Sequence, residues 1–296
     1  NVAGSGSAFE SWYSGRKYQT SPTYHTMETC VTFTWMQLCD KLLALTGNPF
    51  YADQIEKSLY NALMAALKDD ASQIAKYSPM EGHRCEGEEQ CGMHINCCNA
   101  NGPRAFALIP DFAVKKMGNE VYVNYYGDMS ASLENGHNKV LVKQHTTYPV
   151  SNVIDITIDV TKENVFGLHL RVPVWSAQTV ITLNGEELKD ICPGTYHAIT
   201  RKWKKGDHIQ IILDMPARLL EQNQMQAIVR GPIVLARDSR FNDGFVDETL
   251  VVDSEDGIVK AEVDSVPGFA WMRLKVPVTV GTDLEGVGMY RNISFC

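Results

Sequence analysis

The sequence predicts a multidomain α+β protein in which helices come first and strands follow. Three observations lead to this prediction. The chain has 296 residues and 44% hydrophobic content, which is enough for two or three domains with cores of their own. Apolar residues recur at helical spacing before Gly118 and at every second position after it. Turn signals separate the later runs, as expected for strands.

Two helices are expected near the start of the chain. Apolar residues at three- and four-residue steps predict the first over residues 31–45. The segment Gly47-Asn48-Pro49 should end that helix and begin the second, whose apolar stripe runs over 52–66.

A third helix is predicted at about residues 101–117, with Pro103 in its first turn and Pro110 at a kink. Three helices with their loops make a poor domain on their own. We therefore interpret residues 1–117 as part of a helical domain whose N-terminal portion is missing from this sequence.

Strands are expected wherever the apolar period is two. In the part 118–225 these runs are 121–125, 140–142, 153–160, 166–172, 179–183 and 208–213. Asn184-Gly185 is the strongest hairpin signal in the chain. Short strands at this spacing predict a β-sandwich over 118–225 rather than a parallel α/β sheet. Further runs at 227–237 and 271–280 predict a second β-sandwich portion over 226–296.

The charge of the chain argues against two classes of partner. A formal net charge of -8 and a pI near 5.5 disfavour nucleic acid, because phosphate binding needs clustered Lys and Arg. No apolar run approaches the roughly 20 residues that span a bilayer, so no membrane partner is expected. The compartment stays open between periplasm and cytoplasm.

Adjacent Cys97 and Cys98, taken with the tripeptide Glu28-Thr29-Cys30, predict a metal site. Consecutive cysteines do not readily bridge to each other. Three sulfurs and one carboxylate complete a tetrahedral zinc shell, and soft thiolates favour zinc over calcium or magnesium. Neighbouring residues point to different sides of a regular helix, so both pairs are expected at helix N-termini. From ligand types alone, a structural zinc that only joins two helices is as good an interpretation as a catalytic one.

The remaining cysteines are less informative. A chain of this size does not need a disulfide framework. Cys39 falls on an apolar helical stripe and is expected in a core. Cys85 and Cys91 flank an acidic segment, and the sequence leaves open whether they bridge, bind metal or do neither.

Several spaced motifs become recognisable together. They are Glu28-Thr29-Cys30, Tyr51-Ala52-Asp53 with Glu56, Leu59-Tyr60-Asn61, Cys97-Cys98, the run from Leu168 to Trp175, and Arg230-Gly231-Pro232. Over essentially the whole chain this set resembles glycoside hydrolase family 127, whose founding activity is β-L-arabinofuranosidase. The resemblance implies that residues 1–117 are the C-terminal helices of an (α/α)6 barrel and that β-sandwich domains follow.

The resemblance also implies a retaining glycosidase with a zinc-bound cysteine nucleophile. Carried onto this chain, the nucleophile is Cys97, its zinc companions are Glu28, Cys30 and Cys98, and the acid/base residue is Glu10. Metal ligation fits such a role, because a free thiol with a pKa of about 8.5 is mostly protonated at neutral pH.

Two further residues match positions in the sugar pocket of the family, namely Glu56 and Tyr77. Each also has a plainer interpretation. Glu56 lies on a helix where a solvated surface carboxylate is as good an assignment, and Tyr77 could equally be a buried aromatic side chain.

The expected function is an exo-acting glycoside hydrolase that releases L-arabinofuranose or a related plant furanoside from an oligosaccharide. One alternative is an enzyme of the same mechanism that acts on a branched acidic sugar of pectin side chains. Another is a non-catalytic carbohydrate-binding module stapled by zinc. The expected partners are the oligosaccharide and the missing barrel portion. The sequence leaves the oligomeric state open, and a homo-oligomer is one of the possibilities.

Overall fold

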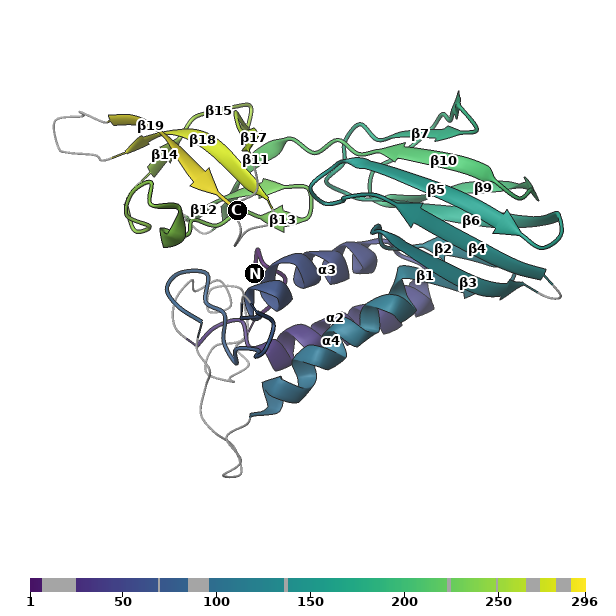
Figure 1. The fold of residues 1–296 in the computed structure, drawn as a ribbon, viewed down its shortest axis with the longest axis horizontal. Helices are drawn as coiled ribbons and strands as arrows, with labels where there is room; N and C mark the ends of the chain where they lie inside the picture. Colours follow the sequence, from purple (N-terminus) through teal and green to yellow (C-terminus); the bar gives the residue numbers. More distant parts are fainter. Residues whose placement is uncertain are drawn as a thin grey trace. The chain divides into compact units, whose positions relative to one another are not determined.

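A computed structural model describes residues 1–6, 25–68, 70–84, 96–135, 138–222, 225–248, 250–264, 272–280 and 289–296 (Figure 1). The chain divides into two compact units, Asn1–Asp214 and Met215–Cys296. The first unit holds the helices and two sheets, and the second unit is built from strands.

The first two helices lie where the sequence predicts them (Figure 1). Helix α2 spans Thr29–Thr46, and helix α3 spans Phe50–Ser58 and continues into the π-helical turn η1, Leu59–Leu63. Gly47 ends α2 in the left-handed region at φ 64°, and its N–H donates to the Leu43 carbonyl at 2.8 Å. A glycine adopts this conformation without the Cβ clash of other residues, which explains why the helix ends here.

The third helix, α4, spans Cys97–Ala113, so the predicted bounds of 101–117 were wrong at both ends. It starts earlier because Asn96 caps it: the Asn96 Oδ1 accepts the Cys98 N–H at 3.0 Å. It stops earlier because strand β1, Val114–Met117, pairs antiparallel with strand β2, Glu120–Val123. With this start, Pro103 lies beyond the first turn and not within it.

The helices share one core. Buried residues from all three helices form one cluster, made of Met36, Cys39, Leu43, Ala52, Ile55, Leu59, Leu63, Ala105 and Phe112. These residues lie at the three- and four-residue steps that define one face of each helix. Cys39 has no exposed surface, which confirms its predicted place in a core.

Two sheets complete the first unit. One has the order β1-β2-β6-β9 and the other the order β3-β4-β5-β10-β7-β8. The strands not yet given are β3 (Met129–Asn135), β4 (Asn138–His145), β5 (Val153–Val160), β6 (Asn164–Val172), β7 (Val180–Leu183), β8 (Glu186–Glu187), β9 (Thr195–Trp203) and β10 (Asp207–Ile212). The pairs within these sheets are antiparallel except β2 with β6. This arrangement agrees with the expected departure from a parallel α/β sheet.

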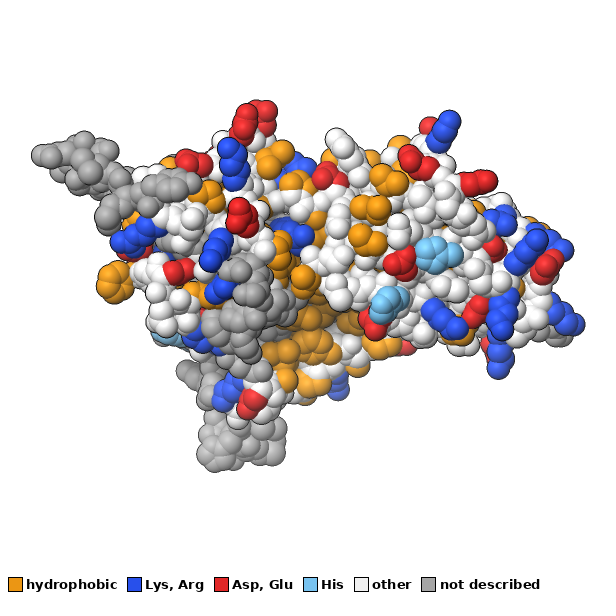
Figure 2. All heavy atoms as spheres, turned by 45° about the horizontal axis from the view of Figure 1, so that its top comes forward, with side chains coloured by type: hydrophobic (Ala, Val, Ile, Leu, Met, Phe, Trp, Pro, Cys, Tyr) orange, Lys and Arg blue, Asp and Glu red, His pale blue; other side chains and the backbone are white. Residues whose placement is uncertain are grey.

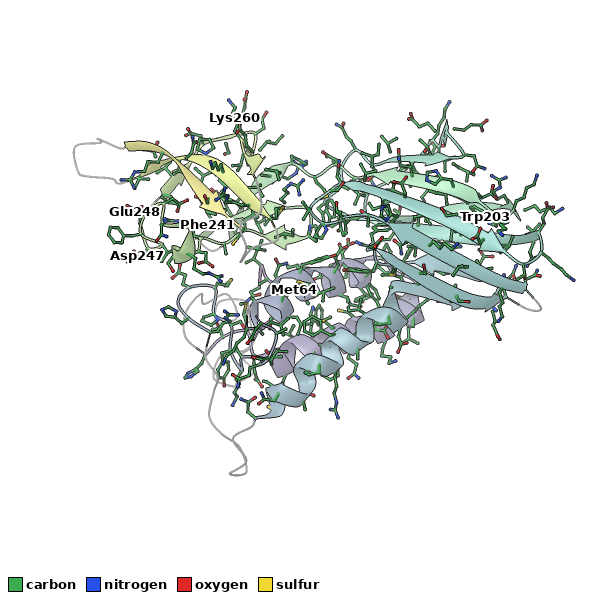
Figure 3. All side chains as sticks on the ribbon, viewed as in Figure 1. Met64, Trp203, Phe241, Asp247, Glu248 and Lys260 are labelled. Carbon is green, nitrogen blue, oxygen red and sulfur yellow. The ribbon has the colours of Figure 1, made fainter. Side chains whose placement is uncertain are left out.

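Side chains along these strands alternate between buried and more exposed positions. In β5 every second residue is buried, with Ile154, Ile156 and Ile158 fully enclosed. Trp203, labelled in Figure 3, is fully buried at the end of β9, and its Nε1 donates to the Phe166 carbonyl at 3.0 Å. The predicted turn at Asn184-Gly185 joins β7 to β8, with φ of 52° and 87°.

The sequence did not predict β3 and β9. Both are edge strands, one in each sheet. Only Asn135 is buried in β3, and only Ile199 and Trp203 are buried in β9. An edge strand with so few buried positions leaves a weak hydrophobic pattern.

The second unit contains a five-stranded sheet of order β13-β12-β11-β16-β15 and a second sheet in which β18 pairs with β14, β17 and β19. Its elements are β11 (Ala217–Gln222), β12 (Met225–Arg230), β13 (Ile233–Val234), η2 (Ser239–Phe241), β14 (Leu250–Val252), β15 (Ser254–Glu255), β16 (Ile258–Val259), β17 (Glu262–Asp264), β18 (Arg273–Val280) and β19 (Met289–Phe295). Figure 3 labels Glu248 in this unit, whose carboxylate lies 3.5 Å from Arg291.

The expected domain boundaries at 117/118 and 225/226 fall inside hairpins of the structure. The first lies at the turn between β1 and β2, and the second lies between Met225 and Gln226 in the β11–β12 hairpin. The division of the chain into two compact units falls between Asp214 and Met215.

A buried ion-pair cluster attaches α3 to the sheets of the first unit. Arg171 of β6 is fully buried and binds Asp53 and Glu56, both from α3. The Glu56 Oε1 lies 2.6 Å from Arg171 Nη2 and accepts the Tyr148 hydroxyl at 2.8 Å. The cluster therefore fixes the helix against the strands that follow it.

The surface carries charges of both signs. Figure 2 shows Lys and Arg side chains interspersed with Asp and Glu on the face drawn. Within the described ranges, no helix is long and apolar enough to cross a membrane.

Candidate metal centre

Two helix starts, far apart in the sequence, supply the four predicted ligands. Glu28 occupies the N-cap position of α2 in extended conformation, and its side chain makes no capping hydrogen bond. Cys30 is the second residue of that helix, while Cys97 and Cys98 are the first two residues of α4. The prediction that both ligand pairs lie at helix N-termini is confirmed.

A short segment, residues 74–78, lies beside the start of α2. The Thr29 N–H donates to the Lys76 carbonyl at 3.0 Å, and the Thr29 hydroxyl donates to the Ala75 carbonyl at 2.8 Å. Glu28 and Tyr77 form an antiparallel bridge. These bonds hold the backbone before Cys30 in one place.

The same segment packs against the start of α4. Cys98 is fully buried in a cluster with Ala66 and Ile74. Gly102, one turn further along α4, passes so close that a Cβ there would lie 2.1 Å from Ile74 Cδ1. The absence of a side chain at position 102 is therefore what lets α4 approach the segment.

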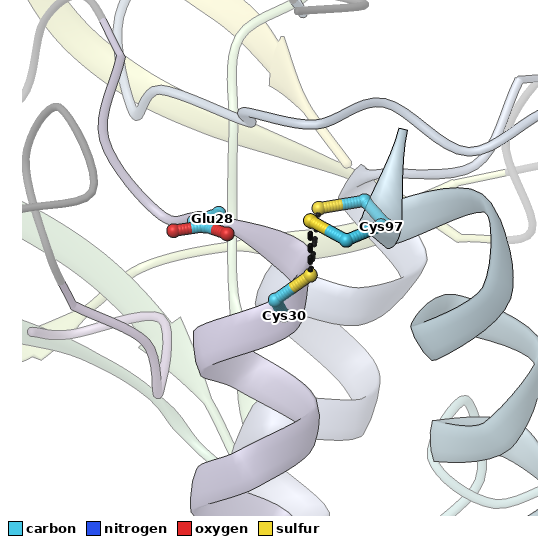
Figure 4. Close-up of side chains that lie close together, drawn as sticks. Glu28, Cys30 and Cys97 are labelled. Carbon is cyan, nitrogen blue, oxygen red and sulfur yellow. Dashed lines mark hydrogen bonds between the residues drawn. The ribbon is translucent and has the colours of Figure 1, made fainter. Parts of the chain in front are cut away.

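The four ligand atoms gather within a small volume (Figure 4). One carboxylate oxygen of Glu28 and the three sulfurs all lie within 4.8 Å of one another. The Cys30 sulfur is 3.0 Å from that of Cys97 and 3.2 Å from that of Cys98. Glu28 and Cys98 are buried, whereas Cys30 and Cys97 are half-buried and define the more open side.

This donor set suits a divalent cation. Atoms bound to one tetrahedral ion at about 2.0–2.3 Å are less than about 4 Å apart, so side-chain adjustments of about 1 Å bring all four onto it. Burial and the neighbouring Cys30 raise the pKa of Cys97 to about 11. The hydrogen bond to Cys98, followed by burial, raises the pKa of Cys30. Without a cation these thiols keep their protons at neutral pH, and a bound cation would displace them.

The other predicted site residues are placed as follows. Glu10 lies outside the described residues, as do Cys85 and Cys91. Tyr77 is buried beside the centre through its bridge to Glu28, and its ring packs edge-on against His25 at 4.7 Å between centroids. Glu56 has no exposed surface, which rules out the alternative of a solvated carboxylate.

The sequence analysis missed one polar residue at the centre. Asn101 follows Cys97 by four residues in α4, and its Nδ2 donates to the Cys30 sulfur at 3.2 Å. A four-residue step places both side chains on one face of a helix. This spacing from Cys97 could have pointed to Asn101 in the sequence. It does so only once the helix is known to begin at Cys97.

Family models match most of the first unit. The model described as "Beta-L-arabinofuranosidase, GH127 catalytic domain" matches residues 2–111. The model described as "Beta-L-arabinofuranosidase, GH127 middle domain" matches residues 120–215. The first match contains all four ligands of the candidate metal centre.

Named proteins that are similar to this chain point to the same family. A curated non-reducing end β-L-arabinofuranosidase from Bifidobacterium longum subsp. longum is 24% identical, over 73% of this chain and 36% of its own length. A solved structure titled as a GH127 β-arabinofuranosidase has a TM-score of 0.81 at 21% identity, covering 100% of this chain and 50% of the other. A GH127 β-L-arabinofuranosidase from Geobacillus stearothermophilus gives 0.76 at 20% identity, with 100% and 51% covered. The chain thus spans about a third to a half of the length of these relatives.

Proposed function

The chain belongs to glycoside hydrolase family 127, and from this premise we propose that it is part of a retaining exo-glycosidase that releases L-arabinofuranose or a related plant furanoside. The observation that carries the proposal is the gathering of Glu28, Cys30, Cys97 and Cys98 at two helix starts within the catalytic-domain match. The name of the curated relative supports arabinofuranose as the sugar.

The proposed architecture follows from the same matches. Helices α2, α3 and α4 would be the C-terminal helices of an (α/α)6 barrel, and the sheets of the first unit the middle β-sandwich domain. The expected division into 1–117, 118–225 and 226–296 stays a prediction. The middle-domain match ends at residue 215 and the β11–β12 hairpin crosses 225, which favours a second boundary near 215.

Zinc is the metal that the donor set favours. Three thiolates and one carboxylate match the softness and the four-coordinate preference of that ion. Glu28, Cys30, Cys97 and Cys98 would hold it. When bound, zinc supplies the Lewis acidity that keeps the coordinated sulfurs deprotonated at neutral pH.

In the proposed mechanism Cys97 is the nucleophile, as the family resemblance implies. Its sulfur is half-buried, whereas Cys98 is fully enclosed. The Cys97 sulfur attacks the anomeric carbon as Glu10 donates a proton to the departing glycosidic oxygen. Glu10 then takes a proton from water, and that water displaces the sulfur from the sugar. Two displacements at one carbon restore its configuration, which defines a retaining enzyme.

The surroundings of Glu56 and Tyr77 support a sugar-binding role to different degrees. Tyr77 adjoins the metal ligand Glu28 through the backbone bridge, which supports a place near the substrate. Glu56 is enclosed by Arg171 and Tyr148, and this supports a role in holding α3. Assignment of either residue to the substrate remains a prediction.

Trapping of the complete protein tests the proposal. A mechanism-based β-L-arabinofuranoside that leaves a covalent sugar on its nucleophile should label the peptide that contains Cys97, as seen by mass spectrometry. Cys97→Ser should abolish labelling, and Cys192→Ser, at an exposed cysteine elsewhere in the first unit, should not. A sugar adduct on a carboxylate would overturn the cysteine mechanism while leaving a glycosidase.

A panel of substrates distinguishes the sugars. We expect turnover of arabinofuranosides above that of acidic pectin-derived sugars. The reverse order would favour the pectin-side-chain alternative. No turnover of any substrate by a complete, metal-loaded protein would favour a non-catalytic module.

A further inference from the structure

Two backbone hydrogen bonds join the chain before α2 to segment 74–78, and the stretches between them differ in length. The Thr26 carbonyl accepts the Ser78 N–H at 3.2 Å, and the Thr29 N–H donates to the Lys76 carbonyl at 3.0 Å. The chain therefore advances three residues, from 26 to 29, on one side and two, from 78 to 76, on the other. A regular antiparallel pair advances equally on both sides, so this pairing contains one extra residue and is a β-bulge.

Met27 gives the bulge its shape. Its φ is 54°, in the left-handed region, and Glu28 after it returns to extended conformation. The extra residue of one common kind of bulge is a glycine in this region, because glycine has no Cβ to clash. Most of the other described non-glycine residues with positive φ are Asn or Asp, which adopt it more readily than methionine does: Asn184, Asp190, Asn242 and Asp256.

The surroundings of Met27 hold it in this unfavourable conformation. Its side chain is 3% exposed and packs in a cluster with Ala3 and Ala62. The backbone on either side is tied to segment 74–78 by the two hydrogen bonds above. Residues that their surroundings keep in a strained conformation occur most often at functional sites. Here the next residue is Glu28, the carboxylate of the candidate metal centre.

The bulge decides which side chain reaches the sulfurs. In a regular pair the Lys76 carbonyl would accept the N–H of Glu28, and Glu28 would take the place that Thr29 now has. That place faces the Ala75 carbonyl, which accepts the Thr29 hydroxyl at 2.8 Å and would repel a carboxylate. With the extra residue, Thr29 takes this place, and Glu28 brings a carboxylate oxygen within 4.8 Å of the three sulfurs.

We propose that Met27 is a positioning residue whose left-handed backbone forms the bulge that aims Glu28 at the metal centre. This inference rests on the metal centre proposed above and deepens it. Met27 acts through the backbone and need not touch the metal or the sugar.

Two isomeric substitutions in the complete protein test the inference without any substrate. Isoleucine and leucine contain the same atoms, but a side chain that branches at Cβ opposes positive φ more strongly. Without metal, the isoleucine variant should relax at position 27, and metal binding must then restore the bulge. Met27→Ile should therefore bind zinc about 5- to 30-fold more weakly than Met27→Leu in competition with a chelator.

A matched control places the same substitution away from the centre. Asp256 has a φ of 52° in an exposed turn of the second unit, so Asp256→Ile should leave zinc affinity unchanged. If Met27→Ile does not fold, Met27→Val and Met27→Ala provide a second pair that differs in branching at Cβ, with the weaker binding expected for valine.

The outcomes separate this inference from the proposal beneath it. Folded Met27→Ile and Met27→Leu proteins with equal zinc affinities would overturn the role of Met27 alone, even if their melting temperatures differ. A wild-type protein that binds no zinc would overturn the metal centre, and the role of Met27 with it.

Discussion

Arg171 and Glu56, 115 residues apart in the sequence, meet in an ion pair with no solvent-exposed surface on either side chain. The pair joins β6 to α3, and Asp53 on the same helix also binds the guanidinium. Removal of one member of such a cluster leaves a buried charge without compensation. Its stability effects should therefore be large.

Replacement of the arginine should be strongly destabilising. Arg171→Met leaves the carboxylates of Asp53 and Glu56 buried together, and we expect a loss of about 3–5 kcal/mol in the free energy of unfolding. Denaturant melts of the two proteins measure it. Lys143→Met removes the solvent-accessible partner of Asp159 and should cost at most about 1 kcal/mol. Equal losses for the two variants would contradict the role assigned to Arg171.

A change at Glu56 distinguishes a structural role from a sugar-binding one. Glu56→Gln keeps the shape but removes the charge that faces Arg171, so stability should fall by about 1–3 kcal/mol. Activity should fall in proportion to the folded fraction, with KM unchanged. A raised KM in a variant of wild-type stability would instead support contact with substrate.

Removal of one sulfur should abolish metal retention. We expect about one zinc per chain in the complete wild-type protein, measured by elemental analysis after dialysis. Cys30→Ser should lose it, because a hydroxyl is a poorer ligand than a thiolate. Cys192→Ser, at an exposed position, should keep it. Stoichiometric zinc in Cys30→Ser would show that the ion is held elsewhere.

The close approach at Gly102 predicts a steric coupling. Gly102→Ala places a methyl group against Ile74 and should destabilise the protein by about 1–3 kcal/mol. Ile74→Val shortens the side chain that is struck, so the double variant should recover part of the loss. A thermal-melt cycle of the two single variants and the double variant measures this coupling. If the effects of the two single variants simply add in the double variant, the destabilisation by Gly102→Ala does not arise from contact with Ile74.

Local chemistry made part of this structure predictable. Gly47 and Pro49 marked the junction of α2 and α3, and Asn184-Gly185 marked a hairpin. The N-terminal placement of Cys97 and Cys98 followed from the impossibility of sharing one helix face. The start of α4 was nevertheless misplaced, because the capping strength of Asn96 was not weighed against the apolar pattern.

Long-range partners were not predictable from spacing. Nothing near Glu56 in the sequence indicates that Arg171 will enclose it, since the pairing depends on how β6 packs on α3. The amide of Asn101 likewise acquires its sulfur partner only when two helix starts meet. Hydrophobic patterns of period two or 3.6 describe one helix or strand at a time and say little about contacts between elements.

The 67-residue separation between Cys30 and Cys97 gives the metal centre a thermodynamic consequence. An ion held by both would close a long loop and so restrict the conformations open to the denatured chain, as a covalent cross-link does. By the chain-entropy relation for such loops, the constraint is worth about 4 kcal/mol. Chelation should accordingly lower the melting temperature of the helical part far more than that of the strands beyond residue 215.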